Sequence, residues 1–564
     1  MMRLVERRIT LLLALFLGLL ALAGARSAYL AAIRAPSLKR AANSQQVRVI
    51  DVPAPRGTIT DRHGIELAVS EPADDVTANP QLIRNPVAVA GRLAPLLGQD
   101  VDSVARKLAD RSRGFVYLAR RMPSTRAEVI GALRIEGVDL TPTSRRVYPQ
   151  GGRASQLLGF VGVDGNGLAG LEYSLDRRLR GRDGRRRLVD DALGQPISLR
   201  DERPMRPGQS VRLTIDAAIQ DRAENVLAGV GQRFSPRGAM ALVMDPRTGA
   251  VLALANWPQV DANDPGAAPD YARQDRAVAD AYEPGSTFKP FTVAGALESG
   301  LVTPQTSFEL APQIQVADRT IGEAHERSAE TLTTAQILAQ SSNVGAVTIG
   351  LRLGPQRFDS WVRRFGFGRP TGADVPGEAA GIVPTLDRYS GSSLGNLPIG
   401  QGLAVTPLQM ASAYAVIANG GILRPPHVVA RIGRRARPDP PGHRIISAAT
   451  AASLRTMLEG VLAPGGTASE VSIPGYRLAG KTGTANKPDP VTGGYSQTRY
   501  VASFVGFAPA RSPRLLVAVM VDEPQGEIYG GQVAAPAFEQ IMAFALPYLG
   551  IPPDDPTTGQ APTG

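Results

Sequence analysis

An uncharged, largely apolar stretch covers residues 9–25, and it limits where the rest of the chain can fold. Three arginines precede the stretch within the first eight residues, and Arg26 closes it. Its length is at the short end for a membrane-spanning helix, and basic residues before such a helix predict a cytoplasmic N-terminus. The alternative is a cleaved signal peptide, since Ala23-Gly24-Ala25 resembles a cleavage site. The stretch exceeds an ordinary signal core, so we expect an uncleaved anchor; both interpretations export the remainder of the chain.

The 564 residues are too many for one hydrophobic core, so two or three folded units are expected. Two apolar runs, 239–244 and 250–255, flank an Asp-Pro-Arg-Thr-Gly segment and predict a β-hairpin. The runs 500–507 and 515–521 predict a second hairpin, and 407–418 has a helical pattern between the two. Strands at both ends with helices between them indicate an α+β domain.

Changes of composition along the chain predict its division into segments. The predicted segments are a cytoplasmic tail at 1–8, a transmembrane helix at 9–25, a helical juxtamembrane stalk at 26–50, a domain of short strands and helices at 51–220, the α+β domain at 235–548 and a tail at 549–564. The tail is rich in Pro, Asp, Thr and Gly, and we expect it to be disordered.

The composition argues against metal, thiol and nucleic-acid chemistry. The chain has no cysteine, and its four histidines are scattered, so neither disulfides nor a metal site is expected. The net charge is +11, and arginines are densest at 177–187. That run has no aromatic residues for stacking on bases. A solvated turn is the favoured interpretation, contact with an anionic polymer or lipid surface the alternative, and no nucleic-acid partner is expected.

Lysine is rare: only five of the 62 basic residues are lysines. Unlike arginine, lysine can lose its proton when it is buried or lies near another cation. Lys289 follows Ser286 by three residues at the start of a predicted helix, so the two side chains share one helix face. The helix N-terminus and burial both disfavour the ammonium form of Lys289. A neutral Lys289 could then accept the hydroxyl proton of Ser286 and make it a nucleophile.

Two further motifs follow this pair along the chain. Ser341-Ser342-Asn343 closes a helix-like stretch and offers a hydroxyl and an amide two positions apart. Lys481-Thr482-Gly483-Thr484 begins a predicted strand, where we expect Gly483 to let a substrate backbone lie close. Ser-x-x-Lys, Ser-x-Asn and Lys-Thr-Gly in this order form the active-site set of penicillin-interacting serine enzymes. Each motif alone is explained as a helix cap, a surface amide or a turn; the ordered set is not.

On these motifs the chain resembles the class B penicillin-binding proteins, membrane-anchored peptidoglycan D,D-transpeptidases. The resemblance covers nearly the whole chain, with matching segments at 56–62, 170–172, 213–216, 400–402, 405–409 and 529–531. It implies the penicillin-binding transpeptidase fold, an antiparallel sheet flanked by helices, on an elongated, dimerisation-like pedestal at 51–220. No segment resembles the glycosyltransferase domain of bifunctional relatives. One departure is Asp275, where the family pattern has asparagine before Arg276.

The resemblance also implies roles for individual residues, with no cofactor and no metal. Ser286 attacks the stem peptide's D-Ala-D-Ala carbonyl, and Lys289 is its general base. Ser341, held between Lys289 and Lys481, relays the proton to the leaving amine, and Lys481 also helps to hold the terminal carboxylate. The implied substrate-binding residues are Asn343, Thr482, Gly483 and Thr484, with the backbone N–H groups of Ser286 and Thr484 as the oxyanion hole. β-Lactams are the implied covalent inhibitors.

Several alternatives stay open within and outside this family. Segments 115–120 and 145–149 resemble the septal, cell-division type rather than the elongation type. The implied partners are a membrane-embedded glycan-strand polymerase and other division proteins, with the catalytic domain outside the cytoplasmic membrane at the septum. A serine β-lactamase or β-lactam sensor shares the motif set, but no Glu in this chain has Asn four residues later, as the class A β-lactamase loop requires. An inactive envelope scaffold is the non-enzymatic alternative.

Overall fold

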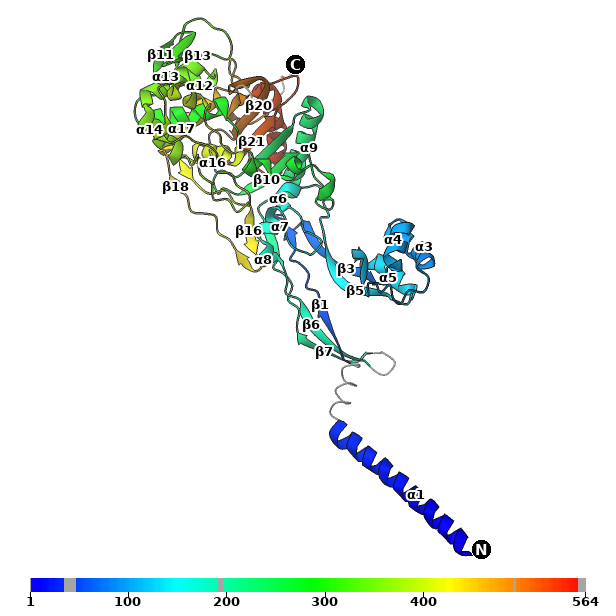
Figure 1. The fold of residues 1–564 in the computed structure, drawn as a ribbon. Helices are drawn as coiled ribbons and strands as arrows, with labels where there is room; N and C mark the ends of the chain where they lie inside the picture. Colours follow the sequence, from blue (N-terminus) through cyan, green and yellow to red (C-terminus); the bar gives the residue numbers. More distant parts are fainter. Residues whose placement is uncertain (1, 35–46, 191–195, 490–492, 556–564) are drawn as a thin grey trace, which may run out of the picture. The chain divides into compact units, whose positions relative to one another are not determined.

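A computed structural model describes residues 2–34, 47–190, 196–489 and 493–555. The chain forms two compact units that are not continuous in sequence (Figure 1). The first comprises residues up to 55 together with 72–144 and 181–207, and the second comprises 56–71, 145–180 and the chain from 208 onward. We describe each unit by itself.

The first unit begins with helix α1 (Met2–Tyr29), which a π-helical turn (Leu30–Arg34) extends. Residues 7–32 are long and apolar enough to cross a membrane, with a mean hydropathy of 2.2, and all of them are exposed. The predicted helical stalk is wrong from Val47 on, because β-branched residues form strand β1 (Val47–Val52) there. The rest of its polar part, including Gln45 and Gln46, lies outside the described residues.

Strand β1 pairs antiparallel with β6 (Gly184–Asp190), which pairs with β7 (Pro196–Arg203). The arginine-rich run therefore enters this sheet rather than forming only a turn, and Arg186 forms an ion pair with Asp201 at 2.7 Å. A separate hydrophobic core in this unit gathers Val76, Leu93, Val104, Leu108, Leu118 and Ile130. Its elements are α3 (Pro86–Leu97), α4 (Val101–Ala109), β4 (Val116–Pro123), α5 (Ser124–Ala132), and parts of β3 (Glu66–Ala78) and β5 (Val138–Val147).

The second unit is built on a five-stranded antiparallel sheet in the order β10-β9-β21-β20-β19. Its strands are β9 (Gly238–Met244), β10 (Val251–Trp257), β19 (Ala479–Pro488), β20 (Tyr495–Ala508) and β21 (Leu515–Asp522). Both predicted hairpins are confirmed, with the pairs β9–β10 and β20–β21. Strand β21 joins the two hairpins by pairing with β9, so the two ends of this domain meet in the middle of the sheet.

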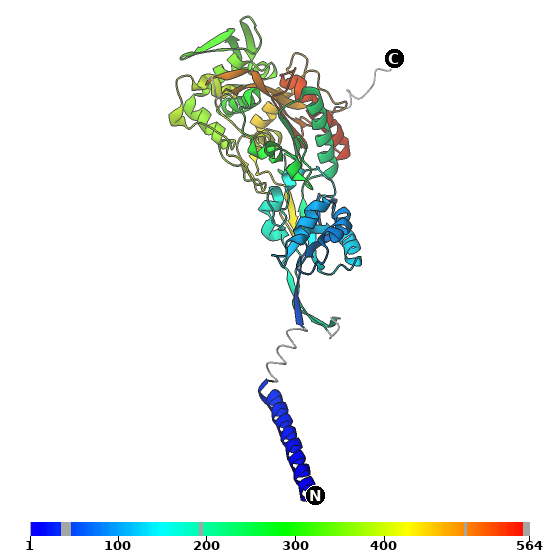
Figure 2. The same ribbon diagram turned by 45° about the vertical axis from the view of Figure 1, so that its right-hand side comes forward.

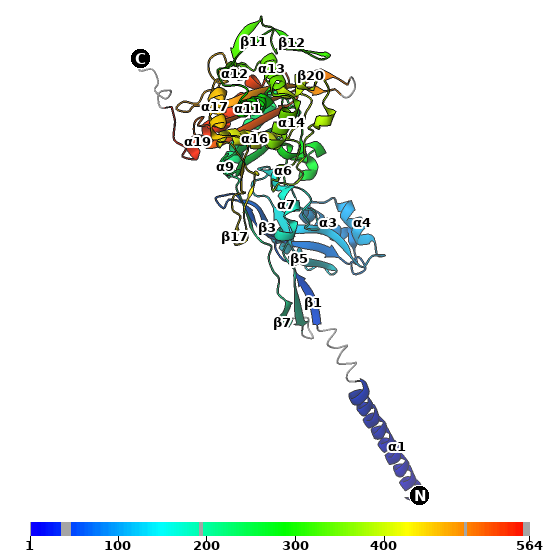
Figure 3. The same ribbon diagram turned by 90° about the vertical axis from the view of Figure 1, so that its left-hand side faces the viewer.

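Helices cover both faces of this sheet. Helices α9 (Ala217–Phe234) and α19 (Ala535–Tyr548) lie side by side on one face (Figure 2). Asp216 caps α9, since its carboxylate accepts a hydrogen bond from Ala218 N. The other face packs against α16 (Pro407–Ala418), all of whose residues are buried, and against α17 (Ala448–Glu459) (Figure 3).

The remaining elements of this unit lie mainly between β10 and β19 or before β9. Those that concern the site are α10 (Arg276–Ala279), α11 (Lys289–Glu298), β12 (Gln313–Val316), β13 (Arg319–Gly322), α12 (Thr334–Ala339), α13 (Asn343–Leu353) and α14 (Pro355–Arg364). The others are β2 (Ile59–Thr60), α6 (Ser155–Leu158), α7 (Gly170–Ser174), α8 (Asp176–Leu179), β8 (Val211–Leu213), β11 (Ser307–Leu310), β14 (Glu330–Thr333), α15 (Ser393–Asn396), β15 (Ile422–Leu423), β16 (Val429–Ile432), β17 (Arg435–Ala436), β18 (His443–Arg444) and α18 (Gly530–Val533).

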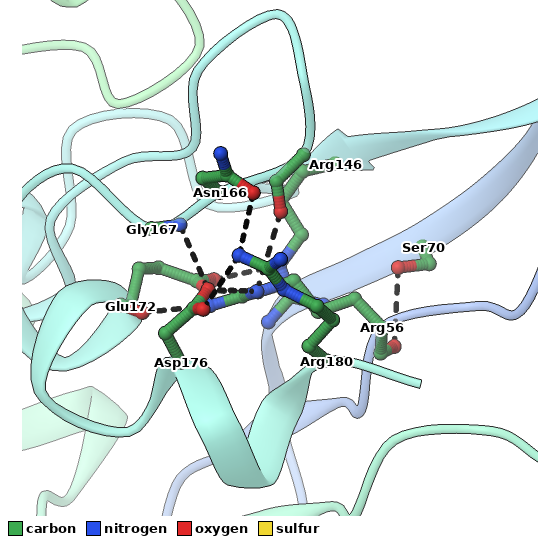
Figure 4. A network of polar contacts seen from close by, with 9 residues as sticks. Arg56, Ser70, Arg146, Asn166, Gly167, Glu172, Asp176 and Arg180 are labelled. Atoms are coloured by element: carbon green, nitrogen blue, oxygen red, sulfur yellow. Dashed lines mark hydrogen bonds and ion pairs between the residues drawn. The ribbon is translucent and has the colours of Figure 1, made fainter. Parts of the chain in front are cut away.

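A buried ionic cluster joins two of the recognised motifs in this unit (Figure 4). Arg56 donates to the carboxylate of Glu172 at 2.5 Å and to Asp176 at 2.7 Å. Arg146 donates to the other oxygen of Glu172 at 2.7 Å, and the Glu172 side chain is fully buried. Removing one partner of a buried ion pair leaves an uncompensated charge and is strongly destabilising. This cluster therefore holds the segments around Arg56, Arg146 and Glu172 together.

The predicted disordered tail is wrong for its first seven residues. Ile551 is buried, and the Tyr476 hydroxyl donates to its carbonyl at 2.6 Å. The Asp554 carboxylate accepts a hydrogen bond from Arg477 N at 2.9 Å. Asp555 also forms an ion pair with Arg477 at 3.3 Å. These contacts hold residues 549–555 against the domain, and residues 556–564 lie outside the described ones.

Candidate active site

We had expected Ser286 to lie in the first turn of an α-helix, but it lies in a tight turn that precedes the helix. The turn is a 3-10 segment (Gly285–Phe288), and α11 begins only at Lys289. Gly285 has a φ of +53° and donates its N–H to the Gly400 carbonyl at 3.0 Å. A Cβ on Gly285 would lie 3.1 Å from the Thr484 carbonyl oxygen. The turn therefore sits directly on strand β19 and brings Ser286 next to the Lys-Thr-Gly-Thr segment.

Lys289 is completely buried and turns toward the second motif. Its Nζ donates to the Ser341 carbonyl at 2.5 Å, to the Ser341 hydroxyl at 3.2 Å and to Asn343 Oδ1 at 2.7 Å. Burial lowers the pKa of Lys289 to about 7, although the carboxylate of Glu323 raises it. The amine is thus poised to gain and lose a proton near neutral pH. Within the described part of the chain, the Ser286 hydroxyl makes no hydrogen bond.

Ser341 and Asn343 occupy the sharp connection between α12 and α13. Ser341 has a φ of +61°, an unusual conformation for a residue with a side chain. Ser342 caps α13 by accepting a hydrogen bond from Gly345 N at 2.9 Å. Asn343 begins that helix and donates its amide to the Gly322 carbonyl at 3.0 Å. This geometry aims both the Ser341 hydroxyl and the Asn343 amide oxygen at Lys289.

Lys481 is also completely buried, on the strand that flanks the turn of Ser286. Burial and the neighbouring Lys289 hold the pKa of Lys481 well below its ordinary value. Its Nζ donates to the Thr482 carbonyl at 3.2 Å and to the Thr482 hydroxyl at 3.3 Å. Among the described residues no hydrogen bond joins Lys481 to Ser341, so the expected bridge from Lys289 through Ser341 to Lys481 is present only in its first half.

Gly483 is required for a different reason than the sequence suggested. A Cβ there would meet the Ser503 hydroxyl, and it would lie 2.8 Å from a methyl carbon of Thr287 and 3.0 Å from the Pro284 carbonyl. The glycine therefore faces the turn that carries Ser286 and not open space for a substrate. Thr482 and Thr484 lie on the other side of the strand, where Thr482 contacts Thr467 at 2.6 Å and Thr484 accepts from Gly530 N at 3.0 Å.

A buried aromatic cluster behind the site was not predicted. Phe291 lies within 5.0–5.3 Å of the ring centroids of Phe365, Phe367 and Tyr414. The Tyr414 hydroxyl donates to the Thr287 carbonyl at 2.7 Å, beside the turn of Ser286. Aromatic residues form only 5 % of the chain, and the members of this cluster come from distant segments, so no local pattern predicts their contact. The cluster anchors the first turn of α11.

Asp275, the one departure from the family pattern, is buried just before α10. Its Oδ1 accepts hydrogen bonds from Ala277 N at 3.1 Å and from the Asn256 amide at 3.2 Å. Its Oδ2 is buried without a partner in the described structure. Burial raises the pKa of Asp275 to about 7, and the nearby carboxylate of Asp280 acts in the same direction. The carboxyl group is therefore largely protonated below neutral pH.

Comparisons with known proteins identify the two domains of the chain. The penicillin binding protein transpeptidase domain matches residues 239–543, and the penicillin-binding protein dimerisation domain matches residues 51–213. The probable peptidoglycan D,D-transpeptidase PenA of Neisseria meningitidis is 34 % identical, over 97 % of this chain and 93 % of the relative. The peptidoglycan D,D-transpeptidase FtsI of Escherichia coli is also 34 % identical, over 98 % and 93 % of the two chains.

A solved structure gives the same result for the fold. Penicillin-binding protein 3 of Mycobacterium tuberculosis, complexed with aztreonam, matches with a TM-score of 0.70 and 30 % identity. The match covers 91 % of this chain and all of that one. The chain belongs to the class B penicillin-binding proteins, with a transpeptidase domain and a dimerisation domain, and it is a peptidoglycan D,D-transpeptidase.

Proposed function

We propose that this chain cross-links peptidoglycan through an acyl-enzyme on Ser286, and that it does so in the septal wall during cell division. The observation that carries the mechanism is the buried amine of Lys289, which has a pKa of about 7 and directly contacts Ser341 and Asn343. A lysine in this state can accept a proton at neutral pH, whereas an exposed lysine cannot.

In the first step the Ser286 hydroxyl attacks the carbonyl carbon between the two terminal D-Ala residues, and its proton passes to Lys289 Nζ. The peptide bond breaks, and the leaving D-Ala amine takes a proton delivered through Ser341. In the second step the amine of a neighbouring stem peptide attacks the ester carbon. Its proton returns through Lys289 to the Ser286 oxygen as the ester bond breaks, which leaves a new peptide cross-link and the free enzyme.

Strand β19 and the Ser341-Ser342-Asn343 motif bind the substrate in this proposal. Thr482 and Thr484 share one side of β19, where their hydroxyls can bind the terminal carboxylate of the stem peptide or of a β-lactam, with Lys481 adding positive charge when protonated. Asn343 binds the peptide backbone. The backbone N–H groups of Ser286 and Thr484 stabilise the oxyanion, a contribution of about 3–4 kcal/mol per donor.

The proposed membrane location is supported by α1. We propose that this helix anchors the chain in the cytoplasmic membrane with the 235–548 domain outside, and that residues 51–220 form the pedestal. The apolar, exposed residues 7–32 support the anchor. Docking of a membrane-embedded glycan-strand polymerase and other division proteins is assigned to the helix and the pedestal. The septal role is supported by segments 115–120 and 145–149, which resemble the septal type.

Cells in which the chain can be replaced by variants test this function. Ser286→Ala is expected to leave the protein in the membrane but to abolish its contribution to cross-linking. Imaging the wild-type chain through the cell cycle is expected to place it at midcell during constriction. Cross-linking supported by the Ser286→Ala variant would contradict the enzyme mechanism, and a distribution along the lateral wall would favour the elongation role. Rapid hydrolysis of penicillin by the purified protein would favour a β-lactamase instead.

A further inference from the structure

Glu323, directly after β13, is a carboxylate at the site that the sequence motifs do not include. Its side chain is only 5 % exposed. One oxygen accepts hydrogen bonds from the Ser342 hydroxyl at 2.6 Å and from Val344 N at 3.2 Å, and the other accepts from Asn343 N at 2.6 Å. Burial alone would raise the pKa of Glu323, but hydrogen bonds from Ser342, Arg327 and Asn343 hold it below its ordinary value. The group is therefore a buried anion at neutral pH.

The Ser342 hydroxyl and the backbone N–H groups of Asn343 and Val344 that donate to Glu323 all belong to the Ser341–Val344 segment. Among the described residues, this segment also provides every hydrogen-bond acceptor of Lys289, namely the carbonyl and hydroxyl of Ser341 and the amide oxygen of Asn343. The neighbouring Gly322 carbonyl accepts the Asn343 amide N–H at 3.0 Å, which fixes the amide so that its oxygen faces Lys289. Glu323 and the residue before it thus hold the partners of Lys289 in place from behind.

Arg327 balances the charge of Glu323. Its guanidinium forms an ion pair with Glu323 at 2.7 Å and another with Glu330 at 2.6 Å, and it is 24 % exposed. The charged groups that act on Lys289 are therefore Glu323, Arg327 and, from β19, Lys481. Apart from burial, which lowers the pKa of Lys289, Glu323 raises this pKa and Arg327 lowers it.

We propose that Glu323 is a positioning residue of the transpeptidase site, which aligns Ser341 and Asn343 on Lys289, and that Glu323 and Arg327 together set how readily Lys289 releases its proton. The inference rests on the proposed function, because it takes Lys289 as the base. The inference adds Glu323 and Arg327, a pair of opposite charges outside the three motifs. This pair acts on the proton transfer of Lys289 without touching the substrate.

The test measures acylation of the full chain in detergent by a fluorescent penicillin between about pH 5 and pH 9, a range of about two units on each side of a pKa of about 7. The midpoint of the acidic limb reports Lys289, and the plateau rate reports alignment. Three variants separate the two effects: Glu323→Gln removes the charge, Glu323→Asp keeps it but shortens the side chain, and Arg327→Gln removes the opposing cation. Glu326→Gln is the matched control, since this exposed glutamate lies in the same loop.

Glu323→Gln is expected to shift the midpoint down by about 0.5–1 pH unit, because it removes the anion that raises the pKa of Lys289. It is also expected to reduce the plateau rate about tenfold, because an amide N–H2 then faces N–H and O–H donors. Glu323→Asp is expected to reduce the plateau while keeping the midpoint. Arg327→Gln is expected to shift the midpoint up by about 0.5–1 unit. Glu326→Gln is expected to change neither quantity.

Opposite shifts for the two charge-removing variants cannot come from a general loss of structure. If Glu323→Gln does not fold, Arg327→Gln still carries the test, because it keeps every hydrogen bond between Glu323 and the Ser341–Val344 segment. Unchanged midpoints, or shifts in the same direction, would overturn the inference. If the wild-type chain is not acylated at all, the proposed function fails instead, so the two failures are distinct.

Discussion

Replacing Asp275 by asparagine should remove a pH-dependent loss of stability that this chain carries within its transpeptidase domain. The Asp275 carboxyl is buried, its Oδ2 lacks a partner in the described structure, and its pKa is raised from 3.8 to about 7. In the unfolded chain it ionises near the lower value. Between the two values the folded state holds a proton that the unfolded state has lost, so the free energy of unfolding falls as the pH rises.

The size of this effect follows from the difference between the two pKa values. At 1.36 kcal/mol per pH unit, raising the pH from 4 to above 7 reduces the free energy of unfolding of the wild type by about 4 kcal/mol relative to Asp275→Asn, which does not titrate. Below pH 4 the protonated acid and the amide are both neutral, and we expect the two proteins to differ by only about 1 kcal/mol.

Urea unfolding followed by tryptophan fluorescence measures this difference. Both tryptophans, Trp257 and Trp361, lie in the second unit, so the signal reports the domain that contains Asp275. Asp318→Asn is the control, because that side chain is 75 % exposed. The variant and the wild type should diverge progressively from pH 4.5 to 8, while the control follows the wild type within about 0.5 kcal/mol. Parallel curves for Asp275→Asn and the wild type would refute the reasoning.

Three further predictions concern the site and its support. Lys289→Arg should abolish penicillin acylation even though it keeps the charge, because arginine does not release a proton. Lys481→Arg should retain part of the acylation rate. Acylation reactions that are stopped at successive times give the rates of both variants and compare the two roles. Gly483→Ala should slow acylation by about tenfold or more, since its methyl group displaces the turn that carries Ser286; a wild-type rate would contradict the packing argument. Phe291→Ala should lower the free energy of unfolding by about 3–5 kcal/mol. Glu172→Gln should lower it by a similar amount, because the buried Arg146 loses its carboxylate partner, and urea unfolding measures both variants.

The sequence predicted the two hairpins of the central sheet because each depends on a local pattern. The two hairpins are short apolar runs around turn residues, and their pairing needs no distant information. The order of the motifs placed Ser286, Lys289 and Lys481 together through a family resemblance. The structure adds that Ser286 belongs to a 3-10 turn and Lys289 to the following helix. Gly285 and its hydrogen bond to Gly400 decide this detail.

What the sequence could not provide are contacts between distant residues. Glu323 is one of several ordinary glutamates in a polar loop, and only the fold brings it to the N-terminus of α13. Gly483 was assigned to substrate access because a sequence does not reveal which side of a strand faces the protein interior. The tail was predicted to be disordered from its composition, yet the single side chain of Ile551 finds a buried site.

The central claim is that Ser286 is the nucleophile and Lys289 its base. Mass spectrometry of the full chain after incubation with a penicillin tests it most directly, with the adduct mapped to a peptide and the acylation rate followed with pH. We predict one penicillin per chain, bound to Ser286, formed at a rate that falls about tenfold per pH unit below a midpoint near 7. An adduct on another residue, or a rate that does not change between pH 5 and 8, would contradict the account.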